Sequence, residues 1–278
     1  MKKINRRSFL AAAGLTAAAL ALTACGGSAS STASSTASSA ASSEAASTSA
    51  AAELTTVEAG KLTMATNAAF PPYEMTTDAG DFEGIDIETA QAIADKLGLE
   101  LQIDDMDFDA ALLSVQQGKA DIVMAGVTVT DERKAVMDFS DSYATGIQSI
   151  IVPEGSDIAS PDDLAGKKIG TQRGTTGYIY CSDDFGDDAV VAYDDGLTAV
   201  QALNNGQVDA VVIDNAPAKE FVAANPGLVI LDTSYAEEDY AIGLAKGSAL
   251  EDAVNAALEE LKADGTLQSI VDKYITAE

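Results

Sequence analysis

The chain has 278 residues, a formal net charge of −28, no histidine and two cysteines. A negative charge of this size repels nucleic acids and anionic lipid, so binding to a phosphate backbone is not expected. Without histidine there is no Ser/His or Cys/His nucleophile and no histidine metal site, which removes most hydrolase chemistry.

Residues 1–24 have the pattern of an export signal. Positive residues precede an apolar run over residues 8–22, which is shorter than the ~20 residues needed to span a bilayer. Residues 22–25, LTAC, resemble the lipobox of bacterial lipoproteins, in which the cysteine is acylated, so Cys25 is the expected lipidation site. A plain secretory signal with an incidental cysteine is the alternative. Arg6 and Arg7 also leave export by the twin-arginine route open.

Residues 25–57 are expected to form a flexible tether. Residues 26–52 are almost entirely Gly, Ser, Thr and Ala, with Glu44 as the only charge and no apolar period. Such a segment cannot offset the entropy of ordering. With Cys25 it predicts an extracytoplasmic protein, either lipid-anchored to the outer face of the cell membrane or periplasmic. The remaining ~220 residues suffice for one large domain or two small lobes.

The body of the chain alternates predicted strands and helices. A helix is expected over residues 86–97, with Asp86 as N-cap and Gly98 past its end, and a second over residues 195–205. This alternation predicts an α/β fold with mostly parallel sheets, whose ligands bind at the carboxyl ends of strands. The other expected elements are strands at 62–66, 99–103, 168–171 and 208–213, and helices from 160, over 216–224 and from a capping box at 248–251 to about 263.

Two segments of the chain resemble each other. Residues 111–123 (ALLSVQQGKADIV) and 199–211 (AVQALNNGQVDAV) each show a helical apolar pattern, two amides, a glycine and a short apolar strand. The repeat predicts two lobes of similar α/β build. Chance similarity of two ordinary α/β units is the alternative.

Three places carry candidate binding chemistry. The segment 126–133 (GVTVTDER) follows a strand, where Thr130 and Asp131 can cap a short helix and Arg133 can bind a carboxylate. The alternative is a surface helix with Arg133 paired to an acid such as Glu132 or Asp138. The segment 170–177 offers glycines and hydroxyls to a small polar ligand, or is simply a turn. Asp214 ends a strand, so it either faces the same crevice or caps the next helix.

Two acidic segments and the second cysteine are not expected to have a special role. The acidic runs at 104–109 and 183–188 lack the spacing of a calcium loop, so solvated loops are expected and no metal site is predicted. With Cys25 assigned to lipid, Cys181 has no partner for an internal disulfide.

An ordered series of motifs resembles the extracytoplasmic amino-acid-binding proteins of ABC importers, solute-binding family 3, which include glutamine, histidine and lysine/arginine/ornithine receptors. The likeness covers nearly all the chain from Leu62 onward. The motifs are 65–74 (ATNAAFPPYE), 82–87 (FEGIDI), 106–108 (MDF), 126–133, 138–140 (DFS), 174–176 (GTT), 208–210 (VDA) and 262–266 (KADGT).

The resemblance implies a two-lobed, type II periplasmic-binding-protein-like fold, in which two crossing strands join the lobes and the lobes close on ligand. Lobe one would hold residues 58–145 plus 243–278, and lobe two residues 146–242. The crossings would lie near 143–147 and 240–243.

The resemblance also implies roles for single residues. Arg133 would clamp the α-carboxylate of an amino acid, helped by Thr128 and the backbone near Thr176. Asp214 and the carbonyl of Gly126 would take the α-ammonium, and Phe70 and Phe108 would flank the side chain. The family often has Asp where this chain has Asn67. The implied ligand-binding set is Asn67, Phe70, Phe108, Ala125, Gly126, Thr128, Arg133, Gln172, Thr175, Thr176 and Asp214.

The expected function is therefore capture of a polar amino acid and its delivery to an ABC permease, by a monomer without cofactor, metal or catalysis. A guanidinium between aromatic faces gains ~1–2 kcal/mol, which favours arginine or lysine modestly. Asn67 and Gln172 would serve glutamine equally well, and cystine is a further alternative. Rival classes are a carboxylate-dependent dehydratase and a sensor or adhesive surface lipoprotein.

Overall fold

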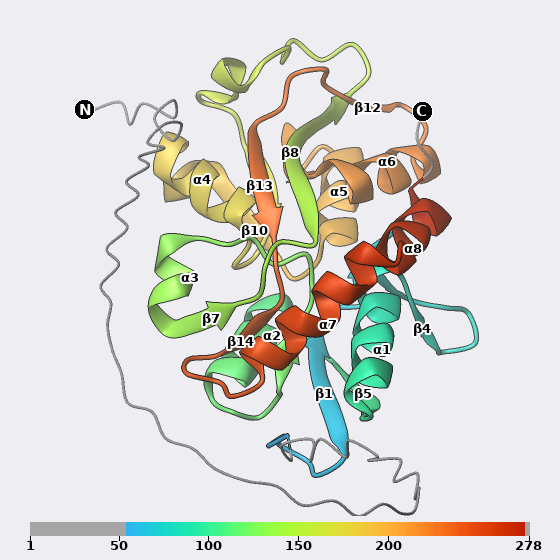
Figure 1. Ribbon diagram of the computed structural model, residues 1–278. Helices are drawn as coiled ribbons and strands as arrows, with labels where there is room; N and C mark the ends of the chain where they lie inside the picture. Colours follow the sequence, from blue (N-terminus) through green and yellow to red (C-terminus); the bar gives the residue numbers. More distant parts are fainter. Residues whose placement is uncertain (1–53, 276–278) are drawn as a thin grey trace, which may run out of the picture. The chain divides into compact units, whose positions relative to one another are not determined.

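The structure is a computed structural model that describes residues 54–275. The predicted export signal, Cys25 and most of the tether lie outside the described residues. Within the described part, no helix is both long and apolar enough to cross a membrane. The described chain forms two α/β lobes, each built on its own sheet (Figure 1).

The first lobe is built on a five-stranded sheet in the order β5-β1-β6-β14-β7. Alternate side chains of β1 face opposite sides. Leu62 and Met64 pack with α1, α7 and α8, whereas Ala65 packs with α2 on the other side. The bounds are β1 Lys61–Thr66, α1 Ile85–Leu97, β5 Glu100–Asp105, α2 Phe108–Gln116, β6 Ile122–Val123, α3 Asp131–Val136, β7 Met137–Phe139, β14 Gly243–Ala245, α7 Glu251–Ala263 and α8 Thr266–Tyr274.

The second lobe is built on a sheet in the order β10-β9-β11-β8-β12, with β13 also paired to β8. Its strands alternate in the same way. Val212 packs on the side of α4, and Val211 packs on the side of α5 and α6. The bounds are β8 Ala144–Pro153, β9 Ile169–Gln172, α4 Thr176–Phe185, β10 Val190–Tyr193, α5 Gly196–Asn204, β11 Ala210–Asp214, α6 Asn215–Ala224, β12 Leu228–Ile230 and β13 Ala236–Tyr240, with short 3-10 turns at Pro161–Leu164 and Asp187–Ala189.

Two chain segments connect the lobes side by side. One enters β8 after Tyr143, and the other leaves β13 at Tyr240 toward β14, and the Tyr143 amide donates to the Tyr240 carbonyl at 2.9 Å. The family resemblance implied crossings near 143–147 and 240–243. The finer lobe boundaries at 145/146 and 242/243 stay predictions.

The direction of the crossing strands changes the character of both sheets. In the first lobe β5, β1 and β6 are parallel, but β14, which arrives from the second lobe, is antiparallel to β6. In the second lobe β10, β9 and β11 are parallel, and β8 is antiparallel to β11. The sheets are therefore mixed rather than mostly parallel.

Two predicted helix starts are wrong in detail. Helix α1 begins at Ile85 with Gly84 in the cap position, and a Cβ on Gly84 would lie 2.2 Å from the Tyr73 carbonyl oxygen. Asp86 is therefore not the N-cap; its side chain is fully buried. Helix α7 begins at Glu251 without a side-chain cap, so the predicted capping box does not form; Ser248 Oγ instead accepts from the Leu250 amide.

A small three-stranded antiparallel sheet, whose first two strands form a hairpin, completes this lobe. It consists of β2 (Ala69–Phe70), β3 (Glu74–Thr76) and β4 (Phe82–Glu83). Because β2 pairs with β3 in antiparallel register, Phe70 lies directly opposite Glu74. The hairpin thereby brings one aromatic and one acidic residue to the edge of the first lobe that faces the second.

Candidate functional site

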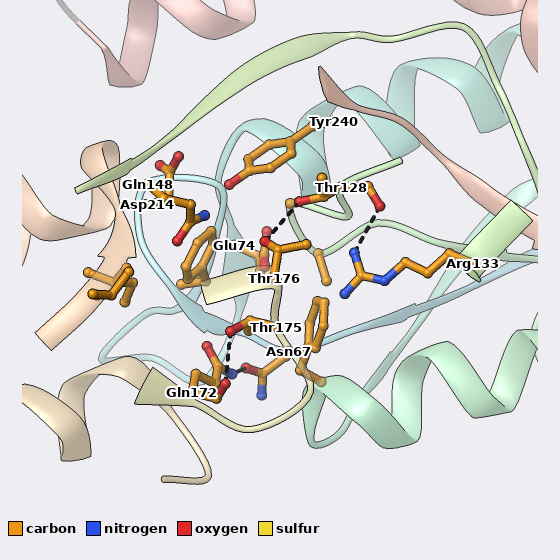
Figure 2. Close-up of a pocket in the computed structure, with 16 residues that line it drawn as sticks. Asn67, Glu74, Thr128, Arg133, Gln148, Gln172, Thr175, Thr176, Asp214 and Tyr240 are labelled. Carbon is orange, nitrogen blue, oxygen red and sulfur yellow. Dashed lines mark hydrogen bonds between the residues drawn. The ribbon is translucent and has the colours of Figure 1, made fainter. Parts of the chain in front are cut away.

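A pocket lies between the lobes, lined by side chains from both (Figure 2). The carboxyl ends of β1, β9 and β11 meet there, as expected for α/β sheets. Every residue of the predicted ligand-binding set lines it. The full lining is Asn67, Phe70, Glu74, Phe108, Ala125, Gly126, Thr128, Arg133, Gln148, Gln172, Thr175, Thr176, Val212, Ile213, Asp214 and Tyr240.

Arg133 enters the pocket from the short helix α3, which Thr130 caps by accepting from the Arg133 amide. The residue is 8% exposed, and its guanidinium donates from Nη1 to the Thr128 carbonyl at 2.8 Å and lies 5.4 Å from the centroid of the Phe108 ring. Burial lowers its pKa below the usual value.

The alternative of a surface helix with a paired Arg133 does not hold. Asp138 pairs with Lys246 instead, and within residues 54–275 no carboxylate lies at ion-pair distance from Arg133. A buried cation without an anion is costly, so the pocket presents Arg133 as a receptor for one.

Asp214 both caps the next helix and faces the crevice, which were the two alternatives for it. Oδ1 accepts from the Ala216 amide at 2.9 Å and caps α6, while Oδ2 accepts from the Ile147 amide at 2.8 Å. The side chain is 2% exposed and lines the pocket. Burial raises its pKa to about 6, although hydrogen bonds from these amides and from Tyr240 oppose the shift. In Figure 2 it lies on the opposite side of the pocket from Arg133.

An amide pair joins the two lobes. Gln172 Nε2, at the end of β9, donates to Asn67 Oδ1 at 2.8 Å, and Asn67 Nδ2 donates to the Met106 carbonyl at 2.9 Å. The Asn67 amide therefore has both polar atoms engaged within the protein. Arg133 Nη2 makes a second contact across the cleft, to the Gly174 carbonyl at 3.1 Å.

Hydroxyl groups from both lobes also meet in the pocket. Thr128 Oγ1 lies 3.4 Å from Thr176 Oγ1 and donates to Glu238 Oε2 at 2.9 Å. Glu238 Oε2 also accepts from Gln148 Nε2. Thr175 Oγ1 donates to the Gln172 carbonyl. Glu238, on β13, therefore orients the Thr128 hydroxyl, which belongs to the predicted ligand-binding set.

Sequence reasoning missed several pocket residues. Gln148 and Tyr240 come from the crossing segments, whose path along the pocket only the folded chain reveals. Glu74 was visible within the motif 65–74, but its place in the pocket depends on the register that sets it opposite Phe70. The carboxyl of Glu74 is fully buried, and neither oxygen has a donor in the described structure.

Among residues 54–275 no cluster of three or more carboxylate or cysteine side chains is arranged to hold an ion. Cys181 is buried in the core between α4 and the second sheet.

Comparisons with known proteins agree with this geometry. The family described as bacterial extracellular solute-binding proteins, family 3, matches residues 62–277. A probable histidine-binding protein of Neisseria gonorrhoeae is 32% identical over 283 residues, covering 99% of this chain and 98% of that protein.

Two solved structures match the described lobes. The arginine-, lysine-, histidine-binding protein ArtJ of Geobacillus stearothermophilus has a TM-score of 0.75 and 34% identity, covering 78% of this chain and 96% of that one. An ancestral arginine-binding protein bound to glutamine has a TM-score of 0.75 and 42% identity, covering 78% of this chain and 99% of that one.

Proposed function

Because the chain belongs to family 3 of the bacterial extracellular solute-binding proteins, we propose that it captures one polar amino acid between its lobes and delivers it to the permease of an ABC importer. Members of the family bind solutes for transport and are not enzymes, which argues against the dehydratase alternative.

One observation carries the proposal: the pocket holds two buried groups of opposite charge that face each other. Arg133 lacks an anionic partner in the described structure, and Asp214 lies across the pocket from it. An amino acid carries a carboxylate and an ammonium group on one carbon, so it can satisfy both. Since the two residues belong to different lobes, the ligand binds the closed form best, which is what a population shift toward closure requires.

The proposed roles follow the same geometry. Arg133 with Thr176 and Thr128 receives the α-carboxylate, and Asp214 with the Gly126 carbonyl receives the α-ammonium. Phe70 and Phe108 flank the side chain, whose polar end reaches Gln172 and Glu74. Thr128 must rotate from Glu238 to donate to a ligand, because its hydroxyl is already engaged.

We propose a modest preference for arginine or lysine, with glutamine or cystine as the alternative. Glu74 supports a cation, because its buried carboxyl lines the pocket without a donor of its own. A relative of known structure is a receptor for arginine, lysine and histidine, and an ancestral arginine-binding protein was solved with glutamine. Gln172 can donate and accept, so a neutral amide also fits.

Family membership supports a place outside the cytoplasm. The lipid anchor on Cys25, the flexible tether over residues 25–57 and a monomeric state complete the proposal. They rest on the sequence patterns alone.

A thermal-shift panel of the twenty amino acids with ornithine and cystine tests this function. Arginine or lysine should raise the unfolding temperature most, because binding to the folded state alone stabilises it. The α-N-acetylated form of the best ligand should have no effect. Stabilisation by glutamine or cystine without arginine or lysine would overturn the cationic preference. No response to any amino acid would overturn the receptor itself.

A further inference from the structure

Asp86 lies behind the pocket wall and organises it without lining it. The residue sits in the first turn of α1 and is fully buried. Its Oδ2 accepts from the Gly126 amide at 2.9 Å and from the Tyr143 hydroxyl at 2.8 Å. Asp86 therefore connects α1, the pocket loop after β6 and one of the two crossings.

The carboxyl of Asp86 also interacts with that of Glu74. Asp86 Oδ1 and both Glu74 oxygens have no donor in the described structure, although all three atoms are buried. The two carboxyl groups are placed to hydrogen-bond with each other, which requires a proton on one of them. Burial raises the pKa of Glu74 well above its usual value and that of Asp86 to about 6.

The hydrogen bonds decide which carboxyl holds the proton. Two donors already point at Asp86 Oδ2, and donors favour the ionised form of an acid. Glu74 has no such donors, which favours the proton on Glu74, and Asp86 Oδ1 is the oxygen of Asp86 left to accept it. Glu74 also lines the pocket.

We propose that Asp86 is a positioning residue of the ligand site, which fixes Gly126 and shares one proton with Glu74, and that a cationic ligand side chain takes the place of this proton. The inference rests on the proposed amino-acid function. In the empty pocket the pair holds one proton and one negative charge. When a cation binds, the proton leaves to solvent, two carboxylates face one ligand cation and the local charge is unchanged. A neutral side chain leaves the proton on Glu74, which then donates to the ligand oxygen.

The other titratable groups near the pair are not expected to release a proton that depends on the charge of the ligand side chain. The other groups that act on the pair are Asp105, Tyr73 and Tyr143, and burial raises the pKa of both phenols so that they stay neutral. Burial raises the pKa of Asp214 to about 6, but its proposed partner is the α-ammonium, which every amino acid carries. A comparison of two ligands that differ only in side-chain charge therefore isolates the pair.

Arginine and citrulline provide that comparison, because they have the same shape and only arginine is charged. Calorimetry in buffers of different ionisation enthalpy, near neutral pH, counts the protons exchanged on binding. We expect roughly one proton released per arginine and none per citrulline. Arginine affinity should also rise with pH up to the raised pKa of Glu74, since binding releases a proton. Citrulline affinity should depend on pH only through groups that act on both ligands, such as Asp214.

The variant Glu74→Gln sharpens the test. Its amide can still donate to Asp86 Oδ1, so the wall should keep its shape, but it cannot ionise. Arginine should lose ~tenfold or more in affinity, the equivalent of one pKa unit or more, citrulline should bind nearly as before, and proton release should vanish. Asp86→Asn should weaken both ligands by loosening Gly126.

The outcomes separate this inference from the proposed function. Tight arginine binding without proton release, or an equal loss of both ligands in Glu74→Gln, would overturn the proton exchange while leaving the receptor intact. If neither ligand nor any other amino acid binds, the proposed function fails instead. The proton count uses the unmodified protein, so the inference stays testable if Asp86→Asn does not fold.

Discussion

Arg133 is the residue on which binding depends most. Arg133→Ala leaves the ligand carboxylate buried without a cation, which costs ~3–5 kcal/mol of the ~8 kcal/mol of a micromolar complex, so a loss of ~100-fold or more is expected. Calorimetry measures it, with circular dichroism confirming the fold. Arg173→Ala is the matched control, because Arg173 is half exposed and pairs with Asp194 outside the pocket. A loss below ~tenfold would contradict the carboxylate role.

Asp214 serves two purposes that a conservative change can separate. Asp214→Asn keeps a side-chain oxygen for the Ala216 amide and so most of the cap on α6, but it removes the charge that faces the α-ammonium. Binding should fall sharply, while the unfolding temperature of the empty protein should fall modestly, because the amide nitrogen of Asn cannot accept from the Ile147 amide. Asp195→Asn provides the control, since Asp195 caps α5 with a 2.7 Å bond from the Thr198 amide. Retained affinity in Asp214→Asn, or equal effects on binding in the two variants, would refute the ammonium role.

Single residues differ in how far the sequence could place them. Arg133 and Asp214 follow recognisable strands, so their arrival at one crevice was predictable from the rule for α/β sheets. The sequence predicts Asp86 as an N-cap, because an acid before an apolar helical pattern usually is one. Only the burial of α1 against the pocket wall gives Asp86 another partner. Glu74 depends on hairpin register, which no local signal fixes.

At the scale of elements, the loop between β6 and α3 requires a glycine at position 126. Gly126 has φ +54°, and a Cβ there would lie 2.9 Å from the Phe70 ring. Gly126→Ala should therefore lower ligand affinity by displacing Phe70, besides costing ~1–2 kcal/mol of stability for the left-handed conformation. The ligand titration and a denaturant curve report these two effects separately.

Gly118 supplies the control for that loop. Its φ is +66°, and a Cβ there would meet nothing within 4 Å. Gly118→Ala should lose similar stability without any loss of affinity. If Gly126→Ala binds as tightly as Gly118→Ala, the close approach of Phe70 does not shape the pocket.

Elements with local signals were predicted well. The two glycines that end the repeated helices, Gly118 and Gly206, both adopt positive φ, as the amide-glycine pattern predicted. The two-lobed type II fold is confirmed by the structural relatives. The direction of β8 and β14 was not predictable locally, because it depends on where the chain crosses between lobes.

For the whole molecule, the sequence predicts attachment to a membrane through one atom. Cys25→Ser should release the protein into the soluble fraction, because serine cannot carry the thioether-linked lipid. Sedimentation of cell membranes followed by immunoblotting measures the release, with Cys181→Ser as a control that should stay attached. Continued sedimentation of Cys25→Ser would refute the lipobox assignment.

The contacts that join the lobes have a consequence for how this receptor can evolve. The Arg133–Gly174 bond and the Thr128–Thr176 contact lie where the α-carboxylate shared by all amino acids is proposed to bind, so they favour closure equally whatever side chain occupies the pocket. A substitution that strengthens them raises the affinity for every amino acid by one common factor. Discrimination between amino acids is a difference between affinities, so a common factor cancels from it. Overall tightness can therefore be tuned at the lobe-to-lobe contacts, while the choice of solute is tuned separately at the buried acids of the pocket wall.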